Sequence, residues 1–216
     1  MDHRTRVFAV VILTLVISLS FGFLTEYVRQ TMTFSWAIEE GDEFIFDVIV
    51  TGITTNGTDE RLPPYADMNI TRISVQITSL PNVSIVFYSR HFLGNIVEHT
   101  KTSSHFANGT DIPSEYRFTV NRHVSRCILP IGGWLHLDAF FPDQVDRSFV
   151  DYESYLSHFR KPSFYFGYIE NTTYEAQEWH GIIDIETGVP LFVSFLLYRT
   201  SSTHTYWYNV TMSLVT

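Results

Sequence analysis

The chain has almost no cysteine, few basic residues and only one long uncharged run that is mostly apolar. Cys127 is the single cysteine among 216 residues, which excludes an intrachain disulfide framework and a zinc-finger-type site. Lys and Arg number 14 against 23 Asp and Glu, and the resulting net charge of −9 argues against nucleic-acid binding. Aromatic residues at 16% and hydrophobic residues at 45% predict a folded domain with a sizeable core.

The uncharged run lies near the N-terminus, from Val7 to Leu24. As a helix it would be roughly 27 Å long, close to the hydrocarbon thickness of a bilayer at about 30 Å. Arg4 and Arg6 precede the run and Glu26 follows it, so the positive-inside rule places residue 1 in the cytoplasm. We therefore expect residues 1–24 to be either a signal peptide or a transmembrane anchor, and residues 25–216 to form a single extracytoplasmic domain. The protein would then be held at the cell membrane by one span, or be secreted after cleavage near residues 20–23.

Glycosylation sequons are unusually frequent. Six of the eight asparagines begin an Asn-x-Ser/Thr triplet, whereas the Ser and Thr content predicts about 1.5 such triplets by chance. Crowding of Asn, Ser and Thr into turns is the other explanation. Together with the predicted export, the excess favours an N-glycosylated domain. The six candidate asparagines are Asn56, Asn69, Asn82, Asn108, Asn171 and Asn209.

Alternation of apolar and polar residues dominates the rest of the chain and predicts β-strands. It extends over residues 44–51, 72–78, 116–121, 164–169, 173–185, 189–199 and 205–215, with a weaker segment at 96–102. Short turns between consecutive strands indicate an antiparallel sheet.

One segment, Gly132–Lys161, instead places its apolar residues at helical spacing. Pro142 suits the first turn of one helix, Asp151 suits the N-cap of a second, and Pro162 would end that second helix. The predicted fold class is therefore α+β and mostly β. It is a curved antiparallel sheet of about nine strands, with a pair of short helices packed on one face, preceded by the N-terminal hydrophobic helix.

Three short motifs resemble landmarks of uncharacterised archaeal cell-surface proteins, which are secreted or membrane-anchored. These motifs are Trp36 followed by Gly41–Phe46, the stretch Leu129–Trp134, and the hairpin Ile183–Gly188. The resemblance would extend from Trp36 to the C-terminus and implies an exported antiparallel β domain. It implies no catalytic or binding residue.

The sequence contains no recognisable catalytic or cofactor motif. Its nine histidines have no metal-ligand spacing, and we expect surface positions for them. The acidic residues of 143–153 lack the pattern of an EF-hand calcium loop. Cys127 lies in an apolar stretch and is expected to be an inert buried thiol. Glu178 and His180 flank Trp179 on one strand and could act as an acid–base pair, although such pairs are common on ordinary sheets. We expect no enzyme, no metal and no cofactor.

Three functions remain open. The first is a binding module for an apolar or lipid-like ligand or a partner protein, suggested by aromatic side chains on faces that should point inward. A plain hydrophobic core would explain the same side chains. The second is a structural or adhesion protein of the cell surface without a small ligand, and the third is an extracellular hydrolase. The residues that would line the pocket or fill the core are Phe44, Phe46, Tyr116, Phe118, Trp134, Phe164, Phe166, Tyr206 and Tyr208.

Overall fold

The computed structural model describes residues 11–20, 22, 31–32, 34–56, 58–83, 86–87, 96, 98–134, 153–171, 174–201 and 204–215. In chain order, the elements are β1 (Thr31–Met32), β2 (Glu43–Asn56), β3 (Asp59–Arg61), the 3-10 helix η1 (Ala66–Met68), β4 (Thr71–Ser79), β5 (Val86–Phe87), β6 (Lys101–Phe106), α3 (Ser114–Arg126), β7 (Glu153–Arg160), β8 (Ser163–Asn171), β9 (Glu175–Asp184), β10 (Pro190–Thr200) and β11 (His204–Leu214).

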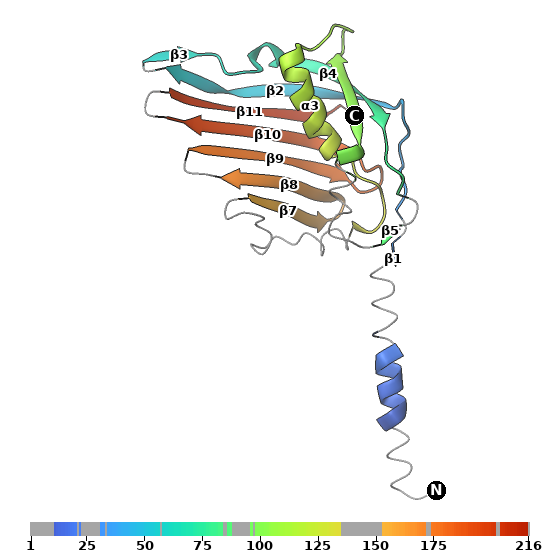
Figure 1. Cartoon of the computed structure of the whole chain (residues 1–216). Coiled ribbons are helices and arrows are strands. Elements are labelled where there is room, and N and C mark those ends of the chain that lie inside the picture. The colour runs from blue at the N-terminus through green and yellow to red at the C-terminus, as the bar shows by residue number, and fades with distance from the viewer. Residues whose placement is uncertain are drawn as a thin grey trace, which may run out of the picture.

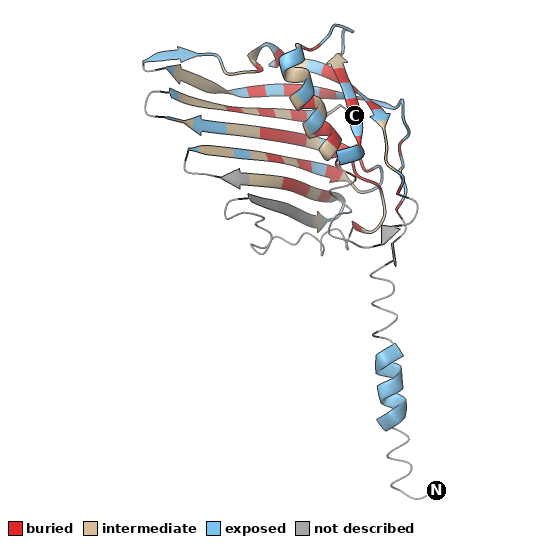
Figure 2. Cartoon of the chain, viewed as in Figure 1, coloured by how far each residue is buried: buried red, intermediate tan, exposed pale blue. Residues whose placement is uncertain are grey.

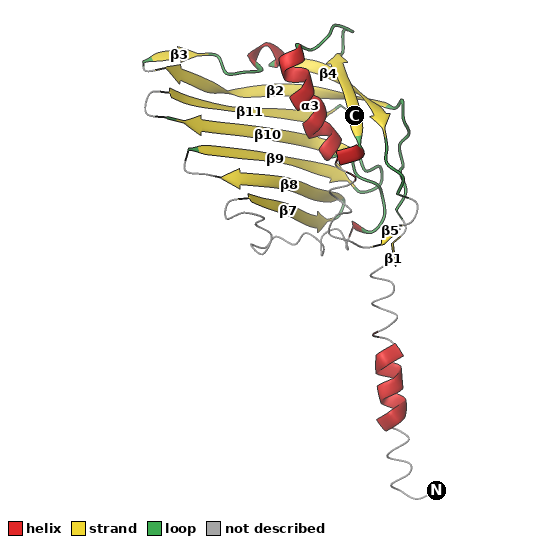
Figure 3. Cartoon of the chain, viewed as in Figure 1, coloured by secondary structure: helices red, strands yellow, loops and turns green. Residues whose placement is uncertain are grey.

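The chain is mostly β and forms an open antiparallel sheet of nine strands, as the alternation predicts (Figures 1 and 3), and β1 and β5 pair in a separate two-stranded sheet. The strand order is β6-β4-β2-β11-β10-β9-β8-β7, with β3 paired to the far end of β2. Strands β7 to β11 follow one another as a meander, because each is joined to the next by a short turn. The C-terminal strand β11 then pairs with β2, so the two ends of the domain meet at the centre of the sheet.

Helix α3 lies across one face of the sheet (Figure 1). Its buried residues Val120 and Val124 and its half-buried Tyr116 are four residues apart, so they form one side of a helix. Glu115 in the first turn and Arg126 in the last turn both suit the helix dipole. The sequence reading of residues 116–121 as a strand was therefore wrong. Phe118, which a strand would have turned inward, is 70% exposed.

The predicted second helix around 151–161 was also wrong. Residues 153–160 form the edge strand β7, which pairs residue by residue with β8. Lys161 and Pro162 make the turn between these two strands. The apolar spacing at the end of this segment fitted a helix, but pairing with the neighbouring strand decided the structure. The first predicted helix, with its Pro142 and most of its apolar positions, falls in 135–152 and lies outside the described residues.

In the N-terminal segment, residues 11–20 are helical and exposed, and the remainder of 1–24 except Gly22 lies outside the described residues. No helix within the described ranges is both long enough and apolar enough to span a membrane.

The core lies between the sheet and the layer formed by α3 and the loops beside it (Figure 2). Phe46, Phe164 and Phe166 are at most 1% exposed and form part of its floor. Gly181 of β9 lets Cys127, at the end of α3, pack directly on the sheet. A Cβ atom added to this glycine would lie 2.6 Å from the sulfur. The buried parts of the strands lie beneath α3, and the ends of the strands on the side of β3 are less deeply buried (Figure 2).

Candidate pocket between helix α3 and the sheet

A cavity of about 410 Å³ lies beside α3, where the helix leaves the inner face of the sheet uncovered. Four α3 residues at spacings of three and four contribute one wall, and strands β8 to β11 contribute the rest. Side chains alternate along a strand, so Glu178 and Leu196 point to the opposite face while their neighbours face the cavity. The lining residues are Thr119, Arg122, His123, Arg126, Tyr168, Glu175, Gln177, Glu178, Trp179, Phe195, Leu196, Leu197, Arg199 and Tyr208.

The floor of the cavity is aromatic. Trp179 lies centrally on β9, and the Tyr168 ring stacks nearly parallel to it at a centroid distance of 6.3 Å. Phe195 and Tyr208 lie on the next two strands, with ring centroids 6.3 Å apart. The three rings Trp179, Phe195 and Tyr208 are all at least 93% buried as residues, so this floor is held rigidly. The Phe195 and Tyr208 rings lie at 85° to each other and are almost fully buried, so the half-buried Tyr168 ring is the part of this floor most open to a ligand.

The walls of the cavity are charged. The Arg126 guanidinium lies over the Trp179 ring, 5.1 Å from its centroid, in a cation–π contact. Across the cavity, Arg199 makes a two-pronged ion pair with Glu175, with N–O distances of 2.8 and 3.1 Å. Hydrogen bonds from Arg199 lower the pKa of the Glu175 carboxyl, so this acid is ionised and neutralises its arginine. Arg122, one turn before Arg126, makes no ion pair within the described part of the chain.

His123 joins the wall to the floor. Its ring stacks on Phe195 at 4.5 Å, and removal from water lowers the pKa of the imidazole to about 4, with the charges of Arg126 and Arg122 acting in the same direction. The ring is therefore neutral at physiological pH. Its Nδ1 lies 2.8 Å from the Thr119 carbonyl oxygen, which can only accept, so Nδ1 carries the proton. Nε2 is then an acceptor, and it has no hydrogen-bond partner among the described residues.

Tyr208 also belongs to a cluster of tyrosines near the start of α3. Tyr65 packs against Tyr116 at 4.4 Å and Tyr208 at 5.0 Å, and Tyr206 contacts Tyr208 edge-on. Burial raises the pKa of Tyr208 above its usual value, and a hydrogen bond with Tyr65 adds to this. The Tyr208 hydroxyl therefore remains neutral and adds no negative charge to the site.

Most of the nine residues predicted to line a pocket or fill a core belong to the core. Phe46, Phe164 and Phe166 are fully buried, and Phe44 packs partly buried against them. Trp134 is 8% exposed, donates a hydrogen bond to the Ile185 carbonyl oxygen at 3.0 Å and packs on Phe164. Tyr116 and Tyr206 are partly buried beside the tyrosine cluster, and Phe118 points to solvent. Tyr208 alone of the nine lines the cavity.

The charged residues of the cavity were missed from the sequence. Reading 116–121 as a strand separated Arg122, His123 and Arg126 from one another. On a helix, Arg126 lies three residues after His123 and four after Arg122, which brings the three side chains to one side. The sequence did contain a signal, which is a cluster of basic residues in an otherwise acidic chain. This cluster indicates a shared site only if the segment is a helix.

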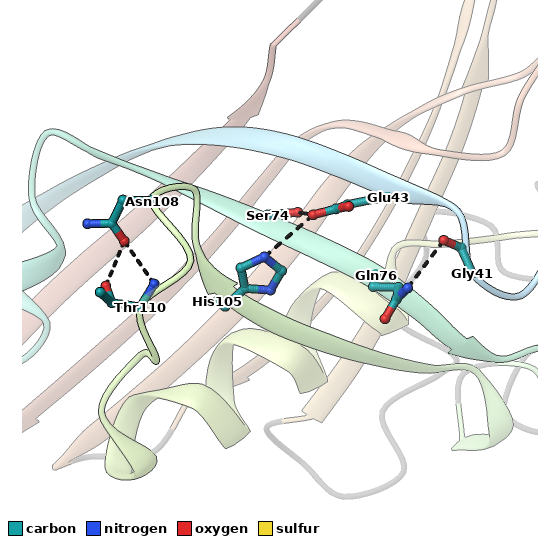
Figure 4. A network of polar contacts seen from close by, with 7 residues as sticks. All are labelled: Gly41, Glu43, Ser74, Gln76, His105, Asn108 and Thr110. Carbon is teal, nitrogen blue, oxygen red and sulfur yellow. Dashed lines mark hydrogen bonds and ion pairs between the residues drawn. The ribbon is translucent and has the colours of Figure 1, made fainter.

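The other chemical candidates lie elsewhere. Cys127 is fully buried, and burial raises the pKa of its thiol far above the usual range, as expected of an inert cysteine. Glu178 and His180 do share a face, with 3.3 Å between Oε1 and Nδ1, but that face is the one opposite the cavity. His105 contacts Glu43 on this same face, and Glu43 accepts a hydrogen bond from Ser74 (Figure 4). Within the described ranges, no cluster of three or more potential metal ligands occurs.

The sequons lie at the periphery of the sheet, with one exception. Asn56 and Asn171 end strands, and Asn69 and Asn82 are exposed in loops. Asn108 lies in a turn, where its Oδ1 accepts hydrogen bonds from the amide and hydroxyl of Thr110 (Figure 4). The exception is Asn209, which occupies the middle of the central strand β11 on the face opposite the cavity.

Comparison with known proteins gives little similarity. No protein-family model matches the chain, and no curated protein matches it either. A crystal structure of a mutant transferrin-binding protein B from Haemophilus parasuis aligns with 84% of this chain, at 4% sequence identity and a TM-score of 0.27. The chain spans 29% of the length of that structure. A similarity this weak supports no argument about fold or function.

Proposed function

We propose that the chain is an exported, N-glycosylated binding module that holds a small ligand between α3 and the sheet. The ligand combines a flat ring, which lies on the aromatic floor, with an anionic group, which faces Arg122 and Arg126. The observation that carries this proposal is a cationic wall over a buried aromatic floor, in a chain whose net charge is −9.

The charge of the cavity supports an anion. Glu175 neutralises Arg199. Arg126 lies over the Trp179 ring, and Arg122, one turn before it, makes no ion pair within the described residues. The surrounding acidic chain would repel a free anion, so binding depends on the local field of these two guanidinium groups. A hydrogen bond to a charged group contributes about 1.5–3 kcal/mol, which corresponds to roughly a tenfold to hundredfold change in affinity.

The position of His123 adds a further requirement. A neutral imidazole whose Nε2 accepts a hydrogen bond favours a ligand with a hydroxyl or amino group next to its ring. A volume of about 410 Å³ suits a single ring system with short substituents. The apolar or lipid-like ligand expected from the sequence is less well suited, because the aromatic residues that suggested it fill the core instead.

The proposal is tested by native mass spectrometry of the protein purified from its own host. We expect the wild-type chain to retain a small anionic compound, and the Arg126→Gln variant to lose it. Arg117→Gln is the matched control, because Arg117 lies on the same helix but contacts Asp111 outside the cavity. A bound compound that all three proteins retain equally would contradict the proposed site.

A further inference from the structure

The face of the sheet opposite α3, here called the outer face, carries an apolar patch at its centre. Strand alternation and pairing bring together residues from β2, β10 and β11. Tyr198 pairs with Trp207, which in turn pairs with Ile53 on β2. The outer patch consists of Ile53, Leu196, Tyr198 and Trp207, together with Ile49, which Thr51 and Asn209 separate from the other four.

This composition is unusual for a solvated sheet face. Antiparallel sheets with one face on a core normally present polar residues on the other. Ile49 is 55% exposed and Tyr198 is 39% exposed, and both lie on central strands where no edge effect explains them. An exposed apolar patch of this kind indicates a surface that is covered in the working protein.

Asn209 lies within the outer patch. Leu196 pairs with it on one side, and Trp207 is two residues away on the same strand face. At a strand spacing of about 4.8 Å and about 6.6 Å per two residues, both side chains are within reach of a first sugar on Asn209. The Ser194 hydroxyl donates a hydrogen bond to Asn209 Oδ1 at 2.9 Å, which leaves the amide nitrogen Nδ2 as the atom available for a glycosidic bond.

We propose that the N-linked glycan of Asn209 covers the outer patch, with its first sugars lying on Trp207 and Leu196. The inference rests on the proposed export and glycosylation, but not on the ligand in the cavity. In the coupling step, Nδ2 bonds to the anomeric carbon of a glycosyl phosphate donor supplied by the host. The sugar–oxygen bond of the donor breaks, the phosphate leaves with the electron pair, and the amide loses one proton. Pyranose rings have an apolar face of C–H groups, which suits an aromatic surface.

Asn108 provides an internal comparison. It is exposed at a turn at the end of the edge strand β6, outside the outer patch, so a glycan there would leave this patch uncovered. A general effect of glycans on solubility would therefore follow loss of either sugar, whereas covering of the outer patch follows loss of the Asn209 sugar alone.

The test uses the full chain from its native host. Glycopeptide mapping first establishes occupancy at each site. The fluorescence of the uncharged dye Nile red and the sedimentation coefficient are then compared for wild type, Asn209→Gln, Thr211→Ala and Asn108→Gln. Thr211→Ala removes the sequon but retains Asn209 and its bond with Ser194. Enzymatic removal of glycans from the folded wild type shows the effect without any substitution.

We expect both Asn209→Gln and Thr211→Ala, and the enzymatically deglycosylated chain, to bind several-fold more dye and to self-associate. Asn108→Gln should match wild type. A bare Asn209 in a chain whose Asn108 is occupied would overturn this inference and leave the proposed export intact. A chain with all six sites bare would overturn the glycosylation itself. An occupied Asn209 whose loss changes neither readout would overturn the covering role alone.

Discussion

At the scale of single residues, the environment of His123 determines what the cavity can bind. Burial of the ring against Phe195, with a smaller effect of the charges of Arg126 and Arg122, lowers its pKa and keeps it neutral, and the Thr119 carbonyl fixes which nitrogen holds the proton. The same environment has a consequence for stability. A histidine that is neutral when folded but free to take up a proton when unfolded makes folding dependent on pH.

Stability should decrease as the pH falls from about 6.5 towards 4. The folded pKa of His123 is about 4, below the ordinary value of 6.5, so the unfolded chain binds more protons between these two values. The stabilisation is thus fully present above pH 6.5 and is lost as the pH falls through this window. Thermal unfolding measured across the window should show a steeper loss for wild type than for His123→Gln. Replacement of the exposed His99 by Gln serves as the control, and equal slopes for all three proteins would contradict the buried neutral ring.

Trp134 should anchor the loop that follows α3. Its ring packs on Phe164 and its indole nitrogen donates to the Ile185 carbonyl oxygen. We expect Trp134→Ala to lower the free energy of unfolding by about 3–5 kcal/mol, from loss of buried volume and of this bond. Trp134→Phe keeps most of the packing and should cost about 1 kcal/mol from the hydrogen bond. Denaturant unfolding distinguishes the two, and a small effect of the alanine variant would show that the ring is not part of the core.

At the scale of elements, most strands of the large sheet could be predicted from the sequence, whereas helix α3 and the edge strand β7 could not. Alternation of apolar and polar residues predicts the four C-terminal strands, and the predicted boundaries agree with the structure within a few residues. In residues 116–124 the apolar positions fit both a period of two and a period near four. Phe118 favoured the strand, and only burial of Val120 and Val124 against the sheet decides for the helix. The candidate site exists only if this segment is a helix, and so the site could not be predicted from the sequence.

The two sides of α3 should respond differently to truncation. Val124 is fully buried against the sheet, so Val124→Ala should cost roughly 2 kcal/mol of unfolding free energy. Phe118 is exposed, so Phe118→Ala should change this free energy by less than about 0.5 kcal/mol, although it removes more atoms. Chemical denaturation of both variants measures the difference. A larger loss for Phe118→Ala would mean that the strand reading was right.

The contact between α3 and β9 gives a second element-scale test. Gly181→Ala would place a methyl group 2.6 Å from the Cys127 sulfur, and we expect a loss of about 1–3 kcal/mol in unfolding free energy from overpacking. Cys127→Gly removes the opposing side chain and should recover part of that loss in the double variant. A double-mutant cycle by denaturant unfolding measures the coupling, and additive effects would contradict the direct contact.

At the scale of the whole molecule, the two faces of the sheet have separate roles in this account. The inner face carries the core and the cavity, while the outer face carries the apolar patch and the Asn209 sequon. The proposed export matters for both faces of the sheet, because N-glycosylation of the outer face requires it. Protease added to intact cells should therefore digest the domain of residues 25–216, as expected from Arg4 and Arg6 inside and acidic residues outside. A domain that is digested only after lysis would contradict the topology.

The most direct measurement for the binding site is a titration with two probes of nearly the same shape. Naphthalene-sulfonate carries the ring and the anionic group, and naphthalene-sulfonamide carries the same ring with a neutral group. Calorimetry of the full chain should show the sulfonate binding at least tenfold more tightly, with this preference lost in Arg126→Gln and kept in Arg117→Gln. Equal affinity of the wild-type chain for the two probes, or a preference that survives Arg126→Gln unchanged, would contradict an anion site between α3 and the sheet.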